Sequence, residues 1–154
     1  MRFAQAVIFA LVAFAALAAR AELQHYDTSS VVIDTAGGPQ RFSVELAITP
    51  EQQEQGLMFR RRLAADAGML FVLPETEQAT FWMKNTLIPL DMLFIAASGR
   101  IADIHERAVP LSEETIASRV PVRAVLELNG GTVARLGIKT GDVVHGSVFH
   151  NAKG

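Results

Sequence analysis

The segment from Val31 to Ile48 constrains the fold most, because its pattern suits two paired β-strands and little else. Val31-Val32-Ile33 is a β-branched run, which favours extended backbone. It is followed by the turn residues Ala36-Gly37-Gly38-Pro39. Residues 41–48 then alternate polar and apolar side chains, so one face of that strand carries Phe42, Val44, Leu46 and Ile48. The sequence therefore predicts a β-hairpin with one buried face.

Two short helices are predicted from the residues that begin and end them. Thr49 suits the N-cap of the first helix, Pro50 suits its first position, and Gly56 ends it. The second helix is expected to be capped by Thr132 and ended by Gly137. Both helices are too short to form a layer of their own, so they are expected to decorate a sheet.

Further strands are expected where apolar runs meet turn residues. They lie at residues 68–73, 81–85, 91–96, 101–107, 123–128 and 143–144. Strands do not alternate with long helices, which argues against a parallel βαβ fold. The sequence predicts a β-rich α+β fold: a single small domain with a curled or barrel-like, mostly antiparallel sheet and two short helices.

The first 21 residues have the three parts of a secretory signal peptide. Met1-Arg2 carries a positive charge, Phe3–Ala19 is apolar apart from one glutamine, and Ala19-Arg20-Ala21 places small residues before the cleavage point. We predict cleavage after Ala21, which leaves residues 22–154 as a single domain that is periplasmic or secreted. The alternative is an uncleaved membrane anchor, although this apolar segment is short for crossing a bilayer. No second membrane span is expected.

Composition excludes several classes of function. The chain has no cysteine, which excludes disulfides, thiol catalysis and cysteine-ligated zinc or iron–sulfur clusters. Its net charge of −2 offers no strongly basic face for DNA or RNA. The four histidines show no metal-ligand spacing. Packing explains Met58, Met69, Met83 and Met92 better than copper binding does, since each lies in an apolar run. We expect no metal, no other cofactor and no nucleic-acid partner.

Several motifs occur in an order that resembles one protein family. They are Gly56-Leu57-Met58-x-Arg60, Gly68-Met69-Leu70-Phe71, Phe81-Trp82-Met83-Lys84-Asn85-Thr86 with Ile88-Pro89-Leu90-Asp91, and Gly137-Ile138-x-x-Gly141-Asp142-x-Val144. On these motifs the chain resembles the DUF192 family, also called UPF0127, over about residues 31–147. The resemblance implies a single small β-rich domain, often exported, and it implies no established biochemical activity.

The segment around Trp82 is the richest candidate for a binding site. If residues 81–85 form a strand, Trp82 and Lys84 share a face, which places an aromatic plane beside a cation. Together with the amide of Asn85, this pair suits a small polar or anionic ligand. The plainer alternative is that Trp82 closes the core while the stem of Lys84 runs along it to water.

Two carboxylates, Asp91 and Glu127, stand between apolar neighbours within predicted strands. Burying an unpaired carboxylate is costly, so we expect Lys84 and Arg60 to pair with them. These side chains then form either the floor of a polar pocket or a structural network of ion pairs that fixes the strand register.

These patterns favour a non-enzymatic exported module that binds a small polar or anionic ligand or a cell-envelope partner. The predicted ligand-binding residues are Arg60, Trp82, Lys84, Asn85, Asp91 and Glu127. The alternative is a cell-envelope hydrolase that uses Asp91 and Glu127 as an acid/base pair, which requires both carboxyls to flank one cleft. The identity of the ligand and the oligomeric state stay open.

Overall fold

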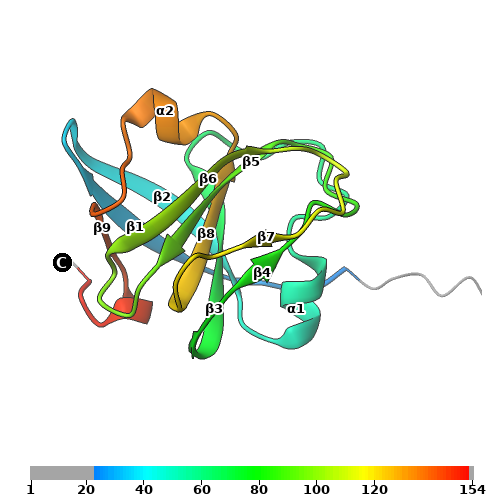
Figure 1. Cartoon of the computed structure of the whole chain (residues 1–154), viewed down its shortest axis with the longest axis horizontal. Helices are drawn as coiled ribbons and strands as arrows, with labels where there is room; N and C mark the ends of the chain where they lie inside the picture. The colour runs from blue at the N-terminus through cyan, green and yellow to red at the C-terminus, as the bar shows by residue number, and fades with distance from the viewer. Residues whose placement is uncertain (1–22, 153–154) are drawn as a thin grey trace, which may run out of the picture.

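The computed structural model describes residues 23–152, so the predicted signal peptide lies outside the described residues. Within this range seven strands form one curled sheet in the order β6-β5-β8-β3-β2-β1-β9 (Figure 1). Their bounds are β1 (Asp27–Thr35), β2 (Gly38–Ala47), β3 (Ala67–Glu77), β5 (Leu90–Ile95), β6 (Ile101–Ala108), β8 (Val122–Asn129) and β9 (Val143–His145). No helix in this part of the chain is long and apolar enough to cross a membrane.

The predicted hairpin is confirmed by strands β1 and β2, which pair antiparallel with Val31 opposite Phe42. The predicted place of Ile48 on the buried face is wrong: β2 ends at Ala47, which is buried, and Ile48 is exposed. The next pair differs: β2 and β3 run parallel, because the chain crosses from one to the other through helix α1 (Pro50–Gln55). The other pairs of this sheet are antiparallel. The fold is therefore a mixed, mostly antiparallel half-barrel, as the sequence predicts in outline.

The two edges of the sheet meet at one corner, beside Gly99. Arg100 forms an antiparallel bridge with Val143, and the backbone N–H of Val144 donates to the Gly99 carbonyl over 2.7 Å. Gly99 has a φ of +84°, and a Cβ on it would lie 2.4 Å from the Val144 carbonyl oxygen. Only glycine allows this close approach, so Gly99 permits the sheet to curl until its edges touch.

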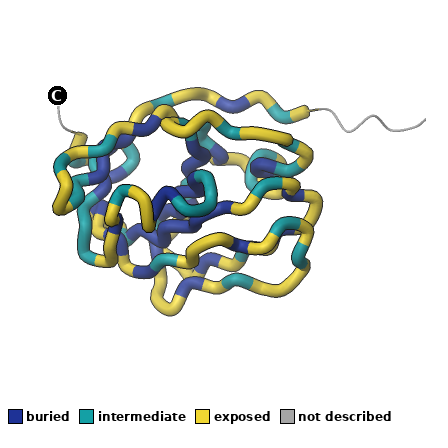
Figure 2. Tube along the Cα trace, turned by 90° about the horizontal axis from the view of Figure 1, so that it is seen from above, coloured by how far each residue is buried: buried dark blue, intermediate teal, exposed yellow. Residues whose placement is uncertain are grey.

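Each face of the sheet carries an apolar core. The inner core takes side chains from all seven strands and from helix α2 (Thr132–Leu136), and Leu126 and Leu128 belong to it. The outer core covers the other face of β3, β5 and β8, and Met69 and Met92 belong to it. Figure 2 shows the buried segments running through the middle of the molecule. Because β5 and β8 are buried on both faces, their sequences are apolar runs rather than alternating patterns.

A two-stranded ribbon helps to cover the outer core. β4 (Thr80–Phe81) pairs with β7 (Ile116–Ala117), and the ribbon lies near α1 (Figure 1). The ring of Phe81 packs edge-on against Phe71, with 5.0 Å between the ring centroids. The ribbon and α1 thus form a second layer over one face of the sheet.

One predicted strand, at residues 81–85, is wrong. The extended backbone ends at Phe81, and Asn85 takes a left-handed conformation with a φ of 55°. The N–H of Thr86 donates to the Met83 carbonyl, which closes a turn. This segment therefore forms a compact bend over the outer core instead of extending the ribbon.

Helix α2 ends at Gly137 as predicted, but its start differs from the prediction. The N-cap is Gly131, in a left-handed conformation with a φ of 92°, and Thr132 is the first helical residue. A glycine has no side chain with which to cap the helix, so the first turn needs an acceptor from elsewhere. A short 3-10 helix, η1 (Ser147–Phe149), follows β9 near the end of the chain.

Candidate functional site

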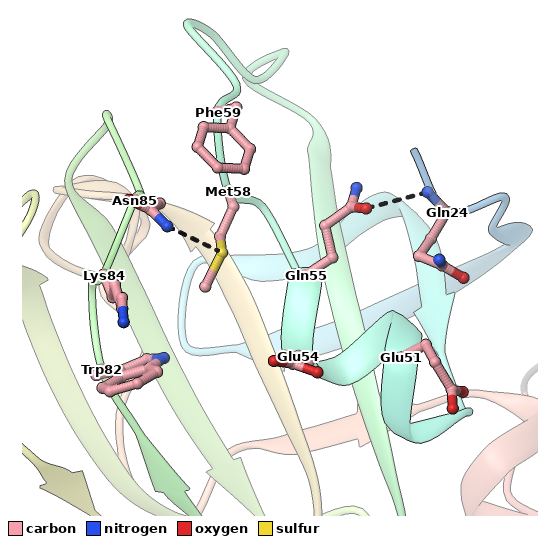
Figure 3. Close-up of a pocket in the computed structure, with 9 residues that line it drawn as sticks. All are labelled: Gln24, Glu51, Glu54, Gln55, Met58, Phe59, Trp82, Lys84 and Asn85. Carbon is pink, nitrogen blue, oxygen red and sulfur yellow. Dashed lines mark hydrogen bonds between the residues drawn. The ribbon is translucent and has the colours of Figure 1, made fainter. Parts of the chain in front are cut away.

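A cleft of about 550 Å³ opens between helix α1 and the segment Trp82–Asn85. In Figure 3 its two sides face each other, with Met58 and Phe59 between them. Its lining residues are Gln24, Glu51, Glu54, Gln55, Met58, Phe59, Trp82, Lys84 and Asn85. This volume lies within the range of roughly 300–1,000 Å³ that is usual for small-molecule sites.

Helix α1 forms one wall of the cleft and is held by polar contacts. Thr49 and Gln52 form a capping box, each side chain bonding the backbone N–H of the other. The side-chain amide of Gln53 donates to a carbonyl of β3 over 2.9 Å. The Tyr26 hydroxyl, whose pKa is raised by burial, donates to the carbonyl of Gly56 over 3.3 Å. Because α1 has no buried residue, these polar contacts set the position of the wall.

Trp82 and Lys84 form the opposite wall. The Lys84 Nζ lies 4.9 Å from the centre of the Trp82 ring, which is a cation–π contact. The same Nζ lies 3.6 Å from a carboxylate oxygen of Glu113. Trp82 is 47% exposed. The alternative in which Trp82 closes the core is therefore wrong, and its indole ring borders the cleft instead.

One end of the cleft is closed by two residues with unusual backbone. Phe59 and Asn85 both have positive φ, 64° and 55°, although neither is glycine. The N–H of Phe59 donates to the Asn85 carbonyl over 2.9 Å, which joins the two walls. The amide of Asn85 also lies 3.9 Å from the sulfur of Met58. Strained backbone of this kind clusters at ligand sites, because the surrounding structure must stabilise it.

A second hollow of about 400 Å³ lies next to the cleft. It has apolar walls from Phe71, Leu73 and Phe81, and it shares Glu54 and Trp82 with the cleft. The two hollows therefore adjoin along these two side chains. Trp82 can contact a ligand in either hollow.

Glu127 lines a small third hollow of about 40 Å³, together with Trp82 and residues of α1, and we call this hollow the channel. Glu127 is 4% exposed, and its neighbours on the adjacent strands are Met69 and Met92. Its carboxyl makes no hydrogen bond or ion pair to any residue between 23 and 152. Burial raises the pKa of Glu127 to about 8, because its charged form loses its hydration.

Asp91 has a different environment and caps helix α2. It is fully buried, and its carboxylate accepts hydrogen bonds from the backbone N–H groups of Gly131 at 3.1 Å, Val133 at 2.8 Å and Arg107 at 2.8 Å. Two of these donors belong to the start of α2, which explains why a glycine can occupy the N-cap there. Asp91 is thus part of the framework and does not line the cleft.

The acid/base pair of the hydrolase alternative is wrong, because the sheet separates its two members. Asp91 lies opposite Leu128 and Glu127 lies opposite Met92 in the β5–β8 ladder. Cross-strand partners share a face, and successive residues alternate between faces. Asp91 therefore faces the inner core and Glu127 faces the outer core. Two carboxyls on opposite faces of a sheet cannot flank one scissile bond.

The predicted partners of the buried carboxylates are also wrong. Arg60 forms a two-pronged pair with Glu45 on β2, with Nη2 3.0 Å from Oε1. Its guanidinium also lies 5.8 Å from the centre of the Tyr26 ring. Lys84 pairs with Glu113 rather than with a buried acid. Arg60 is therefore a framework residue behind the α1 wall and does not line the cleft.

Of the predicted site residues, the structure brings Trp82, Lys84 and Asn85 together at the cleft and places Glu127 below them. The α1 wall, which supplies Glu51, Glu54 and Gln55, was missed. The composition of this helix carries a signal, since Pro-Glu-Gln-Gln-Glu-Gln lacks any apolar face. A helix without an apolar face has nothing to bury, so it remains available as the wall of a site.

The methionines and ionisable side chains do not gather into a metal site. Met69, Met83 and Met92 are buried in the outer core, whereas Met58 lines the cleft. Among residues 23–152, no three histidine, aspartate or glutamate side chains are grouped so that they could hold a metal ion. The outer core thus uses methionine as packing beneath the cleft.

Comparisons with known proteins agree with this fold. The DUF192 family model (Uncharacterized ACR, COG1430) matches residues 31–146. The crystal structure of a Sinorhizobium meliloti 1021 protein described as a candidate transcription regulator is 54% identical, with a TM-score of 0.79 over 82% of this chain and 98% of that one. A Novosphingobium aromaticivorans DSM 12444 protein of unknown function is 42% identical, with a TM-score of 0.77 over 80% of this chain and 89% of that one. No curated protein matches the chain.

Proposed function

The chain belongs to the DUF192 family, and from this premise we propose that its domain is a non-enzymatic binding module for a small polar ligand. The family is uncharacterised, so the proposal rests on the cleft between α1 and the Trp82–Asn85 segment. One observation carries it: a half-exposed indole ring stands among amide and carboxylate side chains in a hollow of about 550 Å³.

The lining residues suit a ligand with both a flat or apolar face and polar groups. The ring of Trp82 offers a surface for stacking. Across the cleft, Gln55 and Glu54 offer a carboxamide and a carboxylate, and Asn85 adds a second carboxamide at the closed end. This combination fixes the orientation of a ligand by hydrogen bonds while the indole supplies contact area.

The charges at the cleft narrow the class of ligand. Glu51 and Glu54 line it, and Glu127 lies below it, whereas Lys84 is its one basic lining residue. Lys84 is already close to Glu113. An anion would therefore meet more negative than positive charge, so we restrict the proposal to neutral or cationic polar ligands.

We propose no nucleic-acid partner for this domain. The description of the Sinorhizobium meliloti protein belongs to that protein. In this chain the net charge is −2 and the cleft is lined by acids, which repel a phosphate backbone.

We also propose that the domain acts outside the cytoplasm, as residues 22–154 after cleavage of the predicted signal peptide. Support comes from the charged start, apolar segment and small-residue exit of the first 21 residues. The test is the intact mass of the protein recovered from the periplasm or medium of the producing cell. A mass that includes residues 1–21 would contradict cleavage.

A protein partner is the second candidate, because apolar side chains are exposed beside the cleft. Phe59 is 56% exposed and Leu111 is 59% exposed, and the N–H of Leu111 donates to the carbonyl of Thr86, which directly follows the wall segment. Exposed apolar groups that cluster in this way mark interaction surfaces. The substitution Leu111→Ser should then release the protein from the envelope fraction without changing its melting temperature; an unchanged distribution between the fractions argues against a partner.

The binding module is tested with the protein's own tryptophan, since Trp82 is the single tryptophan of the chain. Its fluorescence is followed while neutral sugars, amides, amino sugars and aliphatic amines are added, and the melting temperature is measured in parallel. A ligand at 100 times its dissociation constant stabilises the folded state by about 2.7 kcal/mol.

The matched variants are Trp82→Ala and Val120→Ala, since Val120 is exposed but does not line the cleft. We expect the ligand to stabilise the wild type and Val120→Ala but not Trp82→Ala. The proposal fails if no compound of the panel changes the fluorescence, or if Trp82→Ala is stabilised as much as the wild type.

A further inference from the structure

Glu127 is a buried residue that lines a hollow, and its carboxyl has no partner among residues 23–152. It is 4% exposed, it lies between Met69 and Met92 on neighbouring strands, and it lines the channel beneath Trp82. A carboxyl buried without a hydrogen bond is unfavourable, and folded proteins satisfy nearly all such groups. A ligand group that enters the channel would supply the missing partner.

The groups around the channel favour a cation as that partner. Glu54 is the other ionisable side chain that lines the channel, and it is acidic. The side chains packed against Glu127 from β3 and β5 are the uncharged Met69 and Met92. Trp82 and Phe81 also line the channel, and aromatic rings attract cations. An anionic group would meet two carboxyls here, whereas an ammonium would meet two acceptors.

The size of the channel selects a slender group. Its volume of about 40 Å³ is far below the volume of about 550 Å³ of the cleft that it adjoins. The ammonium end of an unbranched chain suits so small a hollow better than a ring does. Leu57 and Phe71, which also line the channel, offer apolar surface to the methylene groups behind it.

We infer that the cleft binds a linear primary alkylammonium, whose charged end enters the channel and pairs with the carboxylate of Glu127. The inference rests on the binding function proposed above and names the class of its ligand. Trp82 and Met58 then contact the aliphatic chain at the mouth of the channel, and Asn85 and Gln55 contact polar groups farther along the ligand.

Formation of the ion pair at pH 6 releases about one proton. Burial raises the pKa of Glu127 to about 8, so the free protein holds this carboxyl protonated at pH 6, and it must ionise when the ammonium enters. An alkylammonium keeps its charge throughout this range, since its pKa is near ~10.4. The affinity should therefore rise with pH, by about 50-fold from pH 6 to pH 8.

The experiment is a calorimetric and fluorescence titration of the purified protein at pH 6 and pH 8. The probes are n-butylammonium, cadaverine and Nα-acetyl-lysine N-methylamide, with n-butanol as the neutral match. Cadaverine and the lysine derivative distinguish a free amine from a lysine side chain as the source of the ammonium. The variants are Glu127→Gln, which keeps the shape of the side chain but cannot ionise, and Glu54→Gln as the control acid.

We expect the wild type to bind at least one of the ammonium probes and not to bind n-butanol. Its affinity for the ammonium should increase from pH 6 to pH 8. Glu127→Gln should lose at least tenfold in affinity and lose the rise, whereas Glu54→Gln should lose about threefold and keep it. A single cooperative thermal transition of Glu127→Gln at pH 6 establishes that the variant is folded.

Equal binding of n-butylammonium and n-butanol overturns the inference, as does an ammonium affinity that Glu127→Gln leaves unchanged. If a neutral ligand then still depends on Trp82, the binding module stands and only its ligand class is wrong. If no probe of either charge binds at Trp82, both proposals fail.

Discussion

Asp91 and Glu127 are buried carboxyls on adjacent strands, yet they differ in their hydrogen-bond partners. Asp91 faces the inner core and accepts three backbone hydrogen bonds. Glu127 faces the outer core and accepts no hydrogen bond from the described residues. Burial is similar in both, so burial alone does not identify a functional acid. What distinguishes them is whether the fold already satisfies the carboxyl.

The contrast also assigns a role to each face of the sheet. On the inner face, Asp91 fixes the start of α2, and this helix packs on the inner core. On the outer face, Glu127 lines the channel together with residues of α1 and Trp82. The inner face is therefore framework, and the outer face carries the site.

Removal of the Asp91 carboxylate should have the largest effect. Asp91→Ala leaves the buried N–H groups of Gly131, Val133 and Arg107 without an acceptor. We expect the free energy of unfolding to fall by about 3–5 kcal/mol, as for other broken buried charge networks. Urea unfolding at pH 7 measures it. A loss below about 1 kcal/mol would contradict the capping role of Asp91.

Glu127 should make stability fall as pH rises. Its pKa is about 8 in the folded state and near ~4.3 in an unfolded chain. Between these values the unfolded state loses the proton and the folded state keeps it, so each pH unit should cost the fold about 1.4 kcal/mol. Urea unfolding of wild type and Glu127→Gln at pH 5, 6 and 7 isolates this slope. Parallel curves for the two proteins would show that Glu127 ionises normally.

The capping residue of α1 offers a milder counterpart to Asp91. Thr49 caps a helix from its own N-terminus, whereas Asp91 caps α2 from a strand. Thr49→Ala should cost about 1 kcal/mol, because one exposed cap is lost and water can replace it. Thermal unfolding compares it with Asp91→Ala. Similar losses for the two variants would mean that burial of the cap does not matter.

The smallest effect is expected for the exposed ion pair at the cleft. Lys84 and Glu113 are 3.6 Å apart and both are largely in water. Lys84→Gln should change the free energy of unfolding by less than about 0.5 kcal/mol. Comparison of the free energies of unfolding of Lys84→Gln and Glu127→Gln separates the effect of an exposed charge at the cleft from that of the buried carboxyl. A loss above 1 kcal/mol would show that the pair supports the wall.

Much of the fold follows from local patterns in the sequence. The hairpin was predictable because alternation over residues 41–46 fixes one buried face, although the pattern fails at Ile48, which is exposed. Helix α1 was predictable because Thr49, Pro50 and Gly56 act through local backbone geometry. The parallel pairing of β2 with β3 was not predictable, since it depends on where the chain returns to the sheet after α1.

The site was only partly predictable. Trp82, Lys84 and Asn85 lie within four residues of each other, so the sequence alone places an aromatic ring, a cation and an amide together. The sequence also indicates that Asp91 and Glu127 need partners, because both lie between apolar neighbours. It does not indicate which groups those partners are. Asp91 binds backbone N–H groups, which every residue type except proline carries, so no side-chain pattern marks them.

Helix α1 has a consequence for the time course of binding, because its six residues include none that is buried. Segments that bury little apolar surface open by local fluctuations, whereas strands buried on both faces open only when the whole domain unfolds. In hydrogen exchange, the amides of α1 should therefore exchange far ahead of those of β5 and β8. A ligand that approaches Glu127 would then pass a wall that fluctuates locally, while the half-barrel beneath it stays folded.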